Sequence, residues 1–160
     1  MQKVTILCTG KLKEKFYLDA AAEYAKRLSR FCKLEIIELP EERLPEDPSP
    51  AQIEAALANE AEAVRGRLPG GCLLIAMCVE GKERSSEELA RYLADSAAQG
   101  ASHIVFLIGS SYGMHPSLKR QAALRLSMSP MTFPHHLLRV MLLEQIYRAY
   151  QINAGSKYHK

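Results

Sequence analysis

Cysteine is scarce in this 160-residue chain, and none of its four cysteines form the C-x-x-C pair of a zinc or redox site. They are also too few for the disulfide framework of a small secreted protein. Cys8, Cys72 and Cys78 lie within apolar runs, which favours buried free thiols. The sequence therefore implies no metal site.

Long apolar runs are also lacking, and the charge is not strongly biased. The apolar run near the N-terminus is about five residues long, far short of a signal-peptide core or a membrane span, so we expect a cytoplasmic protein. The net charge of +3 permits an anionic partner but is much weaker than that of a dedicated nucleic-acid-binding tail. Charge alone does not establish RNA binding.

No internal repeat, low-complexity tract or linker divides the chain. A chain of 160 residues with 48% hydrophobic residues can bury one core but is too short for two ordinary domains. We therefore predict a single domain over residues 1–160.

Short apolar segments alternate with amphipathic ones. Strands are predicted at Val4–Thr9, Leu34–Leu39, Cys72–Val79 and His103–Ile108. The third is apolar on both faces, as a central strand covered by helices must be. This pattern predicts an α/β fold with a parallel sheet flanked by helices, whose ligands bind beyond the C-terminal ends of the strands. The loops at Glu80, Gly109 and Ser129 are thus the candidate functional loops.

Capping residues mark two of the predicted helices. Ser49 with Gln52, and Ser85 with Glu88, have the spacing of capping boxes. Gly100 is placed to end the second of these helices in a left-handed turn. Further along, we expect a short helix from about residue 117 and a short strand around residues 126–128.

The loop Gly109–Gly113 matches the G-x-S-x-G nucleophile elbow of serine hydrolases, with Ser111 as the nucleophile. Against a hydrolase, Pro116 delays the following helix, and only 47 residues remain downstream for an acid-bearing strand and a histidine loop. The loop can also be a glycine-permitted approach of backbone to a small molecule, or a plain tight turn.

The loop from Met128 to Pro134 combines prolines with bulky apolar side chains, which makes it stiff. Such a loop can point its carbonyls and amides into an apolar slot. It therefore suits recognition of an adenine and a methionine-like tail without any charged residue. The alternative is a proline-locked connector.

The last predicted helix, from about His135 to Asn153, carries apolar residues around almost its whole circumference. This implies either burial on both sides within the fold or contact with a second subunit. We predict a homodimer, with simple core burial as the alternative. Glu144 and Arg148 have the spacing of a structural ion pair.

The C-terminal tail begins flexibly and then combines cationic, aromatic and imidazole groups. A base could stack on Tyr158 while Lys157 meets a phosphate. The alternative is a disordered, solvated end.

Two segments, FLIGSSYGMHP and LSMSPMTFPHHLLRVMLLEQIYRAYQINAGSKYHK, closely resemble the ribosomal RNA large subunit methyltransferase H family. The similarity extends over the whole chain, and the MTFPH, RV, LLEQ-YRA and terminal YH elements fall in one order and spacing. The resemblance implies a SPOUT α/β fold with a C-terminal trefoil knot, a homodimer, and S-adenosylmethionine as methyl donor. It also implies methylation of N3 of a pseudouridine in the 23S rRNA of the assembled ribosome.

Matching positions carry the family's cofactor contacts onto this chain. The resemblance assigns them to Met77, Gly109, Met128, Ser129, Pro130, Met131, Thr132 and Phe133. The chain departs from the family at Ser110, where a second glycine is usual, and at Lys157, where proline is frequent. The first departure concerns the cofactor pocket, and the second concerns how the tail is held.

The target imide nitrogen carries a proton at neutral pH. We expect His159 to assist its loss, or a cation such as Arg139 to stabilise the developing negative charge. The competing class is a non-catalytic dimeric ribosome-binding module. Cofactor affinity separates the two, because a binding module has no need of a sulfonium pocket.

Overall fold

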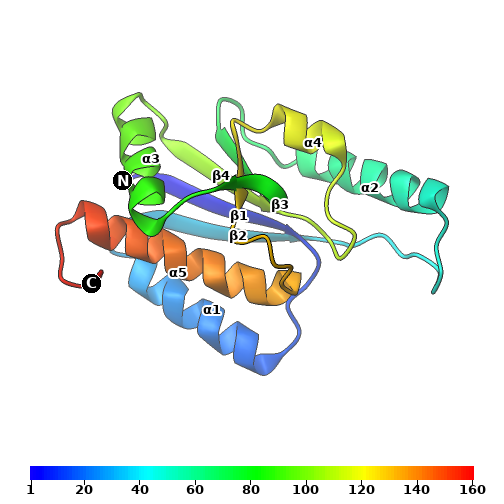
Figure 1. Ribbon diagram of the computed structural model, residues 1–160, viewed down its shortest axis with the longest axis horizontal. Helices are drawn as coiled ribbons and strands as arrows, with labels where there is room; N and C mark the ends of the chain where they lie inside the picture. Colours follow the sequence, from blue (N-terminus) through cyan, green and yellow to red (C-terminus); the bar gives the residue numbers. More distant parts are fainter.

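A single parallel sheet forms the centre of the molecule in the computed structural model, which describes all residues 1–160 (Figure 1). The strand order is β2-β1-β4-β3-β5, and every pairing is parallel. The strands are β1 (Lys3–Thr9), β2 (Lys33–Leu39), β3 (Leu73–Glu83), β4 (His103–Ile108) and β5 (Leu124–Ser127). The predicted α/β class is confirmed.

Helices cover both faces of this sheet, as a parallel sheet requires. They are α1 (Lys15–Leu28), α2 (Pro50–Arg65), α3 (Ser86–Ala98), α4 (Pro116–Gln121) and α5 (His135–Asn153). Helices α1, α3 and α5 form one layer, and α2 and α4 lie on the opposite face (Figure 1). None of the helices is both long and apolar enough to cross a membrane.

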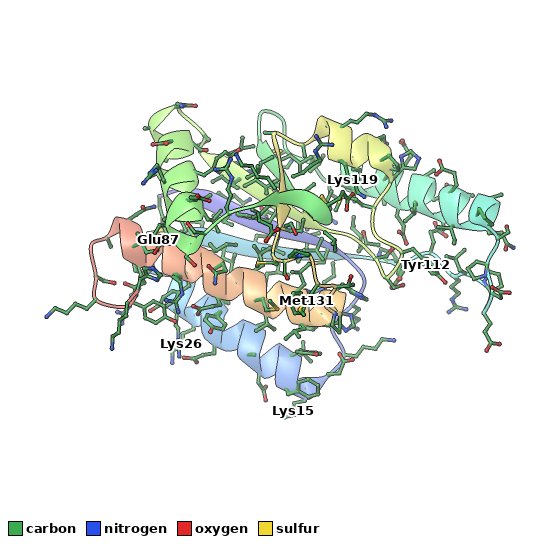
Figure 2. The ribbon with its side chains drawn as sticks, in the orientation of Figure 1. Lys15, Lys26, Glu87, Tyr112, Lys119 and Met131 are labelled. Atoms are coloured by element: carbon green, nitrogen blue, oxygen red, sulfur yellow. The ribbon has the colours of Figure 1, made fainter.

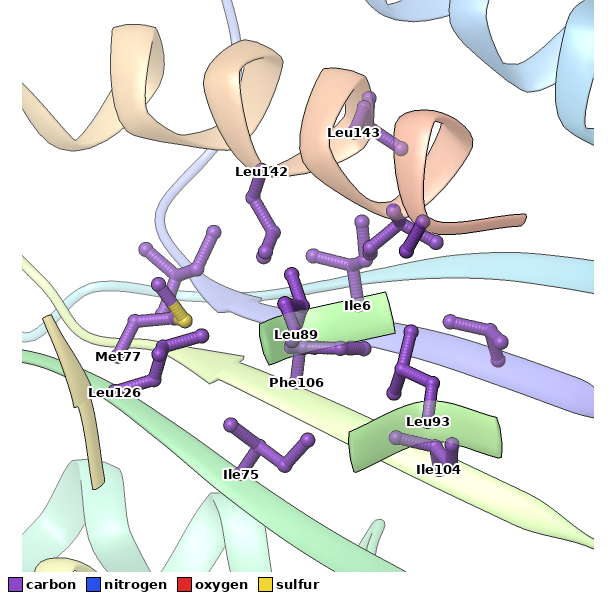
Figure 3. Packing of buried hydrophobic residues seen from close by; sticks show 14 of the residues in the cluster. Ile6, Ile75, Met77, Leu89, Leu93, Ile104, Phe106, Leu126, Leu142 and Leu143 are labelled. Carbon is purple, nitrogen blue, oxygen red and sulfur yellow. The ribbon is translucent and has the colours of Figure 1, made fainter. Parts of the chain in front are cut away.

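Alternation along the strands divides the core into two clusters. In β4, Ile104, Phe106 and Ile108 point into the cluster under α5, while the residues between them belong to the cluster under α2 and α4. Figure 3 shows Phe106 on the sheet beneath Leu142 of α5, both of them fully buried. This central strand is therefore apolar on both faces.

Both predicted capping boxes are present. The Ser49 hydroxyl accepts from the Gln52 amide at the start of α2, and Ser85 accepts from Glu88 at the start of α3. In return, the side chains of Gln52 and Glu88 accept hydrogen bonds from the backbone N–H groups of Ser49 and Ser85, respectively. Gly100 has the expected positive φ, 96°.

The segment after Val79 corrects a prediction. We expected a loop there, but β3 continues to Glu83 and pairs with β5 on both sides of a bulge. Met77 and Lys82 both lie opposite Leu126, and a Cβ added to Gly81 would lie 2.8 Å from the Arg125 carbonyl carbon. The backbone of residues 78–83 therefore crosses close over β5.

β3 lies inside the sheet, between β4 and β5, as predicted for a strand that is apolar on both faces. The bounds of the short last strand differ from the prediction. The short strand begins at Leu124 and ends at Ser127, two residues before the predicted start and one before the predicted end.

All four cysteines are free. Cys8 and Cys32 are buried, and burial raises the pKa of each thiol to about 11. Cys72 and Cys78 are only partly buried. The predicted full burial is thus confirmed for Cys8 alone among the three cysteines of the apolar runs.

Helix α5 has its predicted bounds, and its apolar circumference has a reason within the fold. It packs on the sheet and is flanked by α1 on one side and α3 on the other (Figure 1). Its fully buried apolar residues are Leu142, Leu143, Ile146 and Ala149. Core burial therefore accounts for much of the pattern that suggested a subunit contact.

Candidate cofactor cleft and C-terminal tail

A cleft of about 650 Å³ opens at the C-terminal ends of β3, β4 and β5. Three chain segments line it, residues 77–80, 108–114 and 126–134, and the first turn of α5 adds His135 and Leu138. This is the edge where parallel α/β sheets bind ligands. The three segments that the sequence singled out, one of which belongs to β3, therefore meet around one cavity.

The predicted cofactor residues lie around this cleft, with one exception. Its lining includes Met77, Gly109, Met128, Ser129, Met131, Thr132 and Phe133. Pro130 is exposed on the same loop and does not line the cleft.

The deep walls are apolar, and the loop that forms one side is tied to itself. Met77, Ile108 and Leu126 are buried in the walls. The Ser127 hydroxyl donates to the Ser129 carbonyl at 3.0 Å and accepts from the Ser129 amide at 3.2 Å. Such a slot suits a flat aromatic group held by backbone polar groups.

The charged groups in the lining neutralise each other. Glu80 and Lys119 form an ion pair at the mouth. The hydrogen bond from Lys119 lowers the pKa of Glu80, so that carboxylate is ionised at neutral pH. No unpaired carboxylate or ammonium group is left in the cleft.

The glycine loop is a tight turn. The Ser110 amide donates to the Gly113 carbonyl at 3.0 Å, and the Gly113 amide donates back at 2.8 Å. A Cβ on Gly109 would lie only 2.3 Å from the Gly113 carbonyl oxygen. The turn itself therefore requires glycine at residue 109. The same residue also lines the cleft.

Two carboxylates anchor this turn, and neither could be identified directly from the sequence. The Ser110 hydroxyl donates to Glu60 of α2 at 2.8 Å, and the Ser111 hydroxyl donates to Glu41 at 2.7 Å. Glu60 is only 7% exposed, and burial raises the pKa of its carboxyl group. The departure from glycine at residue 110 was the one available signal. Because Ser111 bonds to a carboxylate and not to a histidine, the turn does not form a serine-hydrolase dyad.

Arg139 lies outside the cleft, in a buried ion pair. It is 4% exposed, and its guanidinium donates to Glu38 at 2.7 Å and to the Gly10 carbonyl at 3.3 Å. Burial acts to raise the pKa of Glu38, but hydrogen bonds from Arg139 and the Leu12 amide outweigh it and lower the pKa. In this structure Arg139 links α5 to β2 and to the end of β1.

The C-terminal tail is docked on the protein, so a disordered end is not what the structure shows. The Tyr158 hydroxyl donates to Glu144 at 2.9 Å, and its ring meets Tyr147 edge-on at 4.9 Å. The Arg148 guanidinium lies 4.7 Å from the Tyr158 ring centre and pairs with Glu144 at 2.8 Å, as predicted. Lys157 is exposed.

His159 lies far from the cleft of its own chain. Its ring nitrogens are 2.7 Å from Glu87 and 3.1 Å from Arg148. Leu138 lines the cleft, and Arg148 follows ten residues later on α5. At a rise of 1.5 Å per residue these two positions are about 15 Å apart. The structure thus places Tyr158 and His159 beside Glu144 and Arg148, in the C-terminal half of α5, whereas the cleft borders its first turn.

Comparison with known proteins places this architecture in a family. Residues 2–159 match the family described as "Predicted SPOUT methyltransferase". The ribosomal RNA large subunit methyltransferase H of Bifidobacterium adolescentis is 48% identical over 158 residues, covering 99% of each chain. The protein of the same name from Streptococcus uberis is 45% identical over 158 residues, with the same coverage.

Solved structures agree at the level of the fold. A methylase-family protein from Haemophilus influenzae Rd KW20 superposes with a TM-score of 0.51 at 13% identity, over 99% of this chain and 70% of the other. Together with the full-length sequence matches, this shows that the chain belongs to the SPOUT methyltransferases and, within them, to the ribosomal RNA large subunit methyltransferase H family.

Proposed function

We propose that this protein is a cytoplasmic, S-adenosylmethionine-dependent methyltransferase that methylates N3 of a pseudouridine in 23S rRNA on the assembled ribosome. The observation that carries the proposal is the cleft beside β3, β4 and β5, around which the expected cofactor segments converge. Support for the substrate comes from the full-length relatives, whose name states large-subunit ribosomal RNA.

The residues present fit the cofactor. The cleft's volume lies within the range of small-molecule sites, and its walls at Met77, Ile108 and Leu126 suit an adenine. The backbone of residues 128–133 supplies polar groups, and the paired charges at the mouth leave no free cation to repel a sulfonium. When bound, S-adenosylmethionine supplies a methyl group activated by its positively charged sulfur.

The chain's own contribution is alignment, exclusion of water and proton removal. The hydrogen-bonded turn at residues 110–113 and the stiff loop at residues 128–134 hold the walls in fixed positions, which favours alignment of the reacting atoms. Of the two candidates, His159 is the one that can accept the imide proton, because a guanidinium has no acceptor atom and Arg139 could only stabilise the developing negative charge.

We propose a homodimer because the cleft borders the first turn of α5, whereas the tail is docked on the C-terminal half of the same helix. In a two-fold dimer with antiparallel α5 helices, the tail of one protomer lies near the cleft of its partner. His159 then acts in the partner's cleft, while Tyr158 and Lys157 bind the RNA beside it. The fold itself we propose to contain a trefoil knot, which is supported by the close crossing of residues 78–83 over β5.

The decisive experiment measures methyl incorporation from labelled S-adenosylmethionine into ribosomes from cells that lack this protein, with naked rRNA as the comparison. We expect incorporation at a single large-subunit pseudouridine, and only in assembled ribosomes. Absence of incorporation in both substrates, together with no measurable affinity for S-adenosylhomocysteine, would instead establish the non-catalytic ribosome-binding module.

A further inference from the structure

Exposed apolar side chains gather at the mouth of the cleft. Of the six large hydrophobic residues that the structure leaves exposed, three line this one cavity: Val79 at 47%, Tyr112 at 47% and Met131 at 72% exposed. They come from three separate segments, the β3 continuation, the 110–113 turn and the 128–134 loop. Figure 2 labels Tyr112 and Met131. Their common position at one opening distinguishes them from isolated surface residues.

Tyr112 stands on the most firmly held of these segments. Its turn is closed by the two backbone hydrogen bonds between Ser110 and Gly113, and its two serines are bonded to Glu60 and Glu41. The Tyr112 side chain itself makes no hydrogen bond to another residue. The backbone beneath this flat, exposed ring is thus already ordered, so only the side-chain torsions of Tyr112 remain to be fixed on binding.

We propose that Tyr112 is a stacking platform for an unpaired base of the RNA substrate at the mouth of the cleft, with Val79 and Met131 forming the rest of an apolar rim. The inference rests on the proposed function. Chemistry on a base requires the base to leave its stack and enter the active site. An aromatic ring at the entrance replaces the lost stacking, and this is how proteins hold single-stranded RNA.

The geometry favours RNA over the other occupants. The deep walls already provide an apolar enclosure for a cofactor, whereas Tyr112 lies at the rim and is half exposed. A second protein chain would need about 800 Å² of continuous surface on each partner. These three side chains surround an opening, which suits a single flat group.

The test compares Tyr112→Ala and Tyr112→Leu with Tyr112→Phe. Alanine and leucine remove the flat ring, and leucine keeps apolar bulk. Two quantities are measured on ribosomes that lack the methyl group. The first is their Kd for the protein without cofactor, and the second is their KM in methyl transfer. We expect Tyr112→Ala and Tyr112→Leu to raise both by about 10-fold, the effect of one stacked base, and Tyr112→Phe to match wild type.

Phe16→Ala is the control, because Phe16 is also an exposed aromatic ring, 66% exposed, but lies on α1 and outside the cleft lining. We expect it to leave both values unchanged. Affinity for S-adenosylhomocysteine and the oligomeric state by light scattering should also stay at wild-type values in the Tyr112 variants. The apparent Tm of each variant confirms that it is folded.

The inference is overturned if Tyr112→Ala binds ribosomes as wild type does, or if Phe16→Ala loses as much. A loss of S-adenosylhomocysteine affinity by the same factor would assign Tyr112 to the cofactor pocket, and a change in oligomeric state would assign it to a subunit contact. Wild-type protein that binds ribosomes but transfers no methyl group counts against the proposed function alone. The binding comparison still decides the role of Tyr112.

Discussion

At the scale of single residues, the buried cation of Arg139 is balanced by one carboxylate. The guanidinium is 4% exposed and forms its only ion pair with Glu38. We expect Glu38→Gln to lower the free energy of unfolding at pH 7 by about 2 kcal/mol, since it leaves a buried cation without a counter-charge. This is below the full cost for a buried pair because the Glu38 side chain is 34% exposed. Urea unfolding measures it.

The same pair has a pH signature. The folded-state pKa of Glu38 lies below its ordinary value of 4.5, so its contribution is present above that pH and is lost as the pH falls through the folded-state pKa. The gap between wild type and Glu38→Gln should therefore narrow below about pH 4.5. The control is Glu35→Gln on the same strand, whose pair with Lys3 is 45% exposed on each side and should contribute less than about 1 kcal/mol. A gap that stays constant with pH would contradict this role.

Gly109 tests the turn beneath the cleft. A Cβ at this position would lie 2.3 Å from the Gly113 carbonyl oxygen and 2.6 Å from its carbon, both backbone atoms. We expect Gly109→Ala to cost about 2 kcal/mol of stability and to weaken binding of S-adenosylhomocysteine, because the turn must move. Gly70→Ala is the control, since nothing lies within 4 Å of its added Cβ. Equal stability and affinity in the two variants would refute the close contact.

At the scale of elements, a capping box between Ser85 and Glu88 marks the N-terminus of α3. Ser85 accepts from the Glu88 amide at 3.1 Å, and the Glu88 side chain accepts from the Ser85 amide at 3.0 Å. Ser85→Ala should lower the free energy of unfolding by about 1 kcal/mol. Ser85→Asp keeps an oxygen acceptor at the cap and should restore most of that stability. If aspartate is as destabilising as alanine, the cap is not the cause.

Such local signals explain which elements the sequence could predict. A capping box or an apolar run lies within a few residues of the structure it specifies, so the starts of α2 and α3 and the positions of four strands were correctly predicted. The second half of β3 could not be found this way. Its residues are polar, and they are extended because β5, some 40 residues later, supplies their hydrogen bonds.

The candidate site likewise has features that the sequence could predict and features that it could not. The loops around the cleft were predictable because the C-terminal ends of parallel strands meet at one edge of the sheet. The partners of Arg139 and His159 were not, since Glu38 and Glu87 are about 100 and 70 residues away in the chain. A residue's type indicates what it can bind but not which group the fold brings to it.

At the scale of the whole molecule, α5 separates two sets of candidate functional residues. Its first turn borders the cleft, and its last turns hold the tail through Glu144 and Arg148. One chain therefore cannot bring His159 to its own cleft without undocking the tail. A dimer resolves this separation if each cleft is completed by the partner's tail.

This arrangement predicts complementation between inactive variants. Phe133→Ala alters the cleft and His159→Ala alters the tail, and we expect each homodimer to lose most methyl transfer. When the two variants are refolded together, mixed dimers contain one site with both an intact cleft and an intact tail. Random mixing makes half of the dimers mixed, so roughly a quarter of wild-type activity should return. If each tail instead serves its own cleft, both sites of a mixed dimer carry a defect, and the mixture stays as inactive as its components.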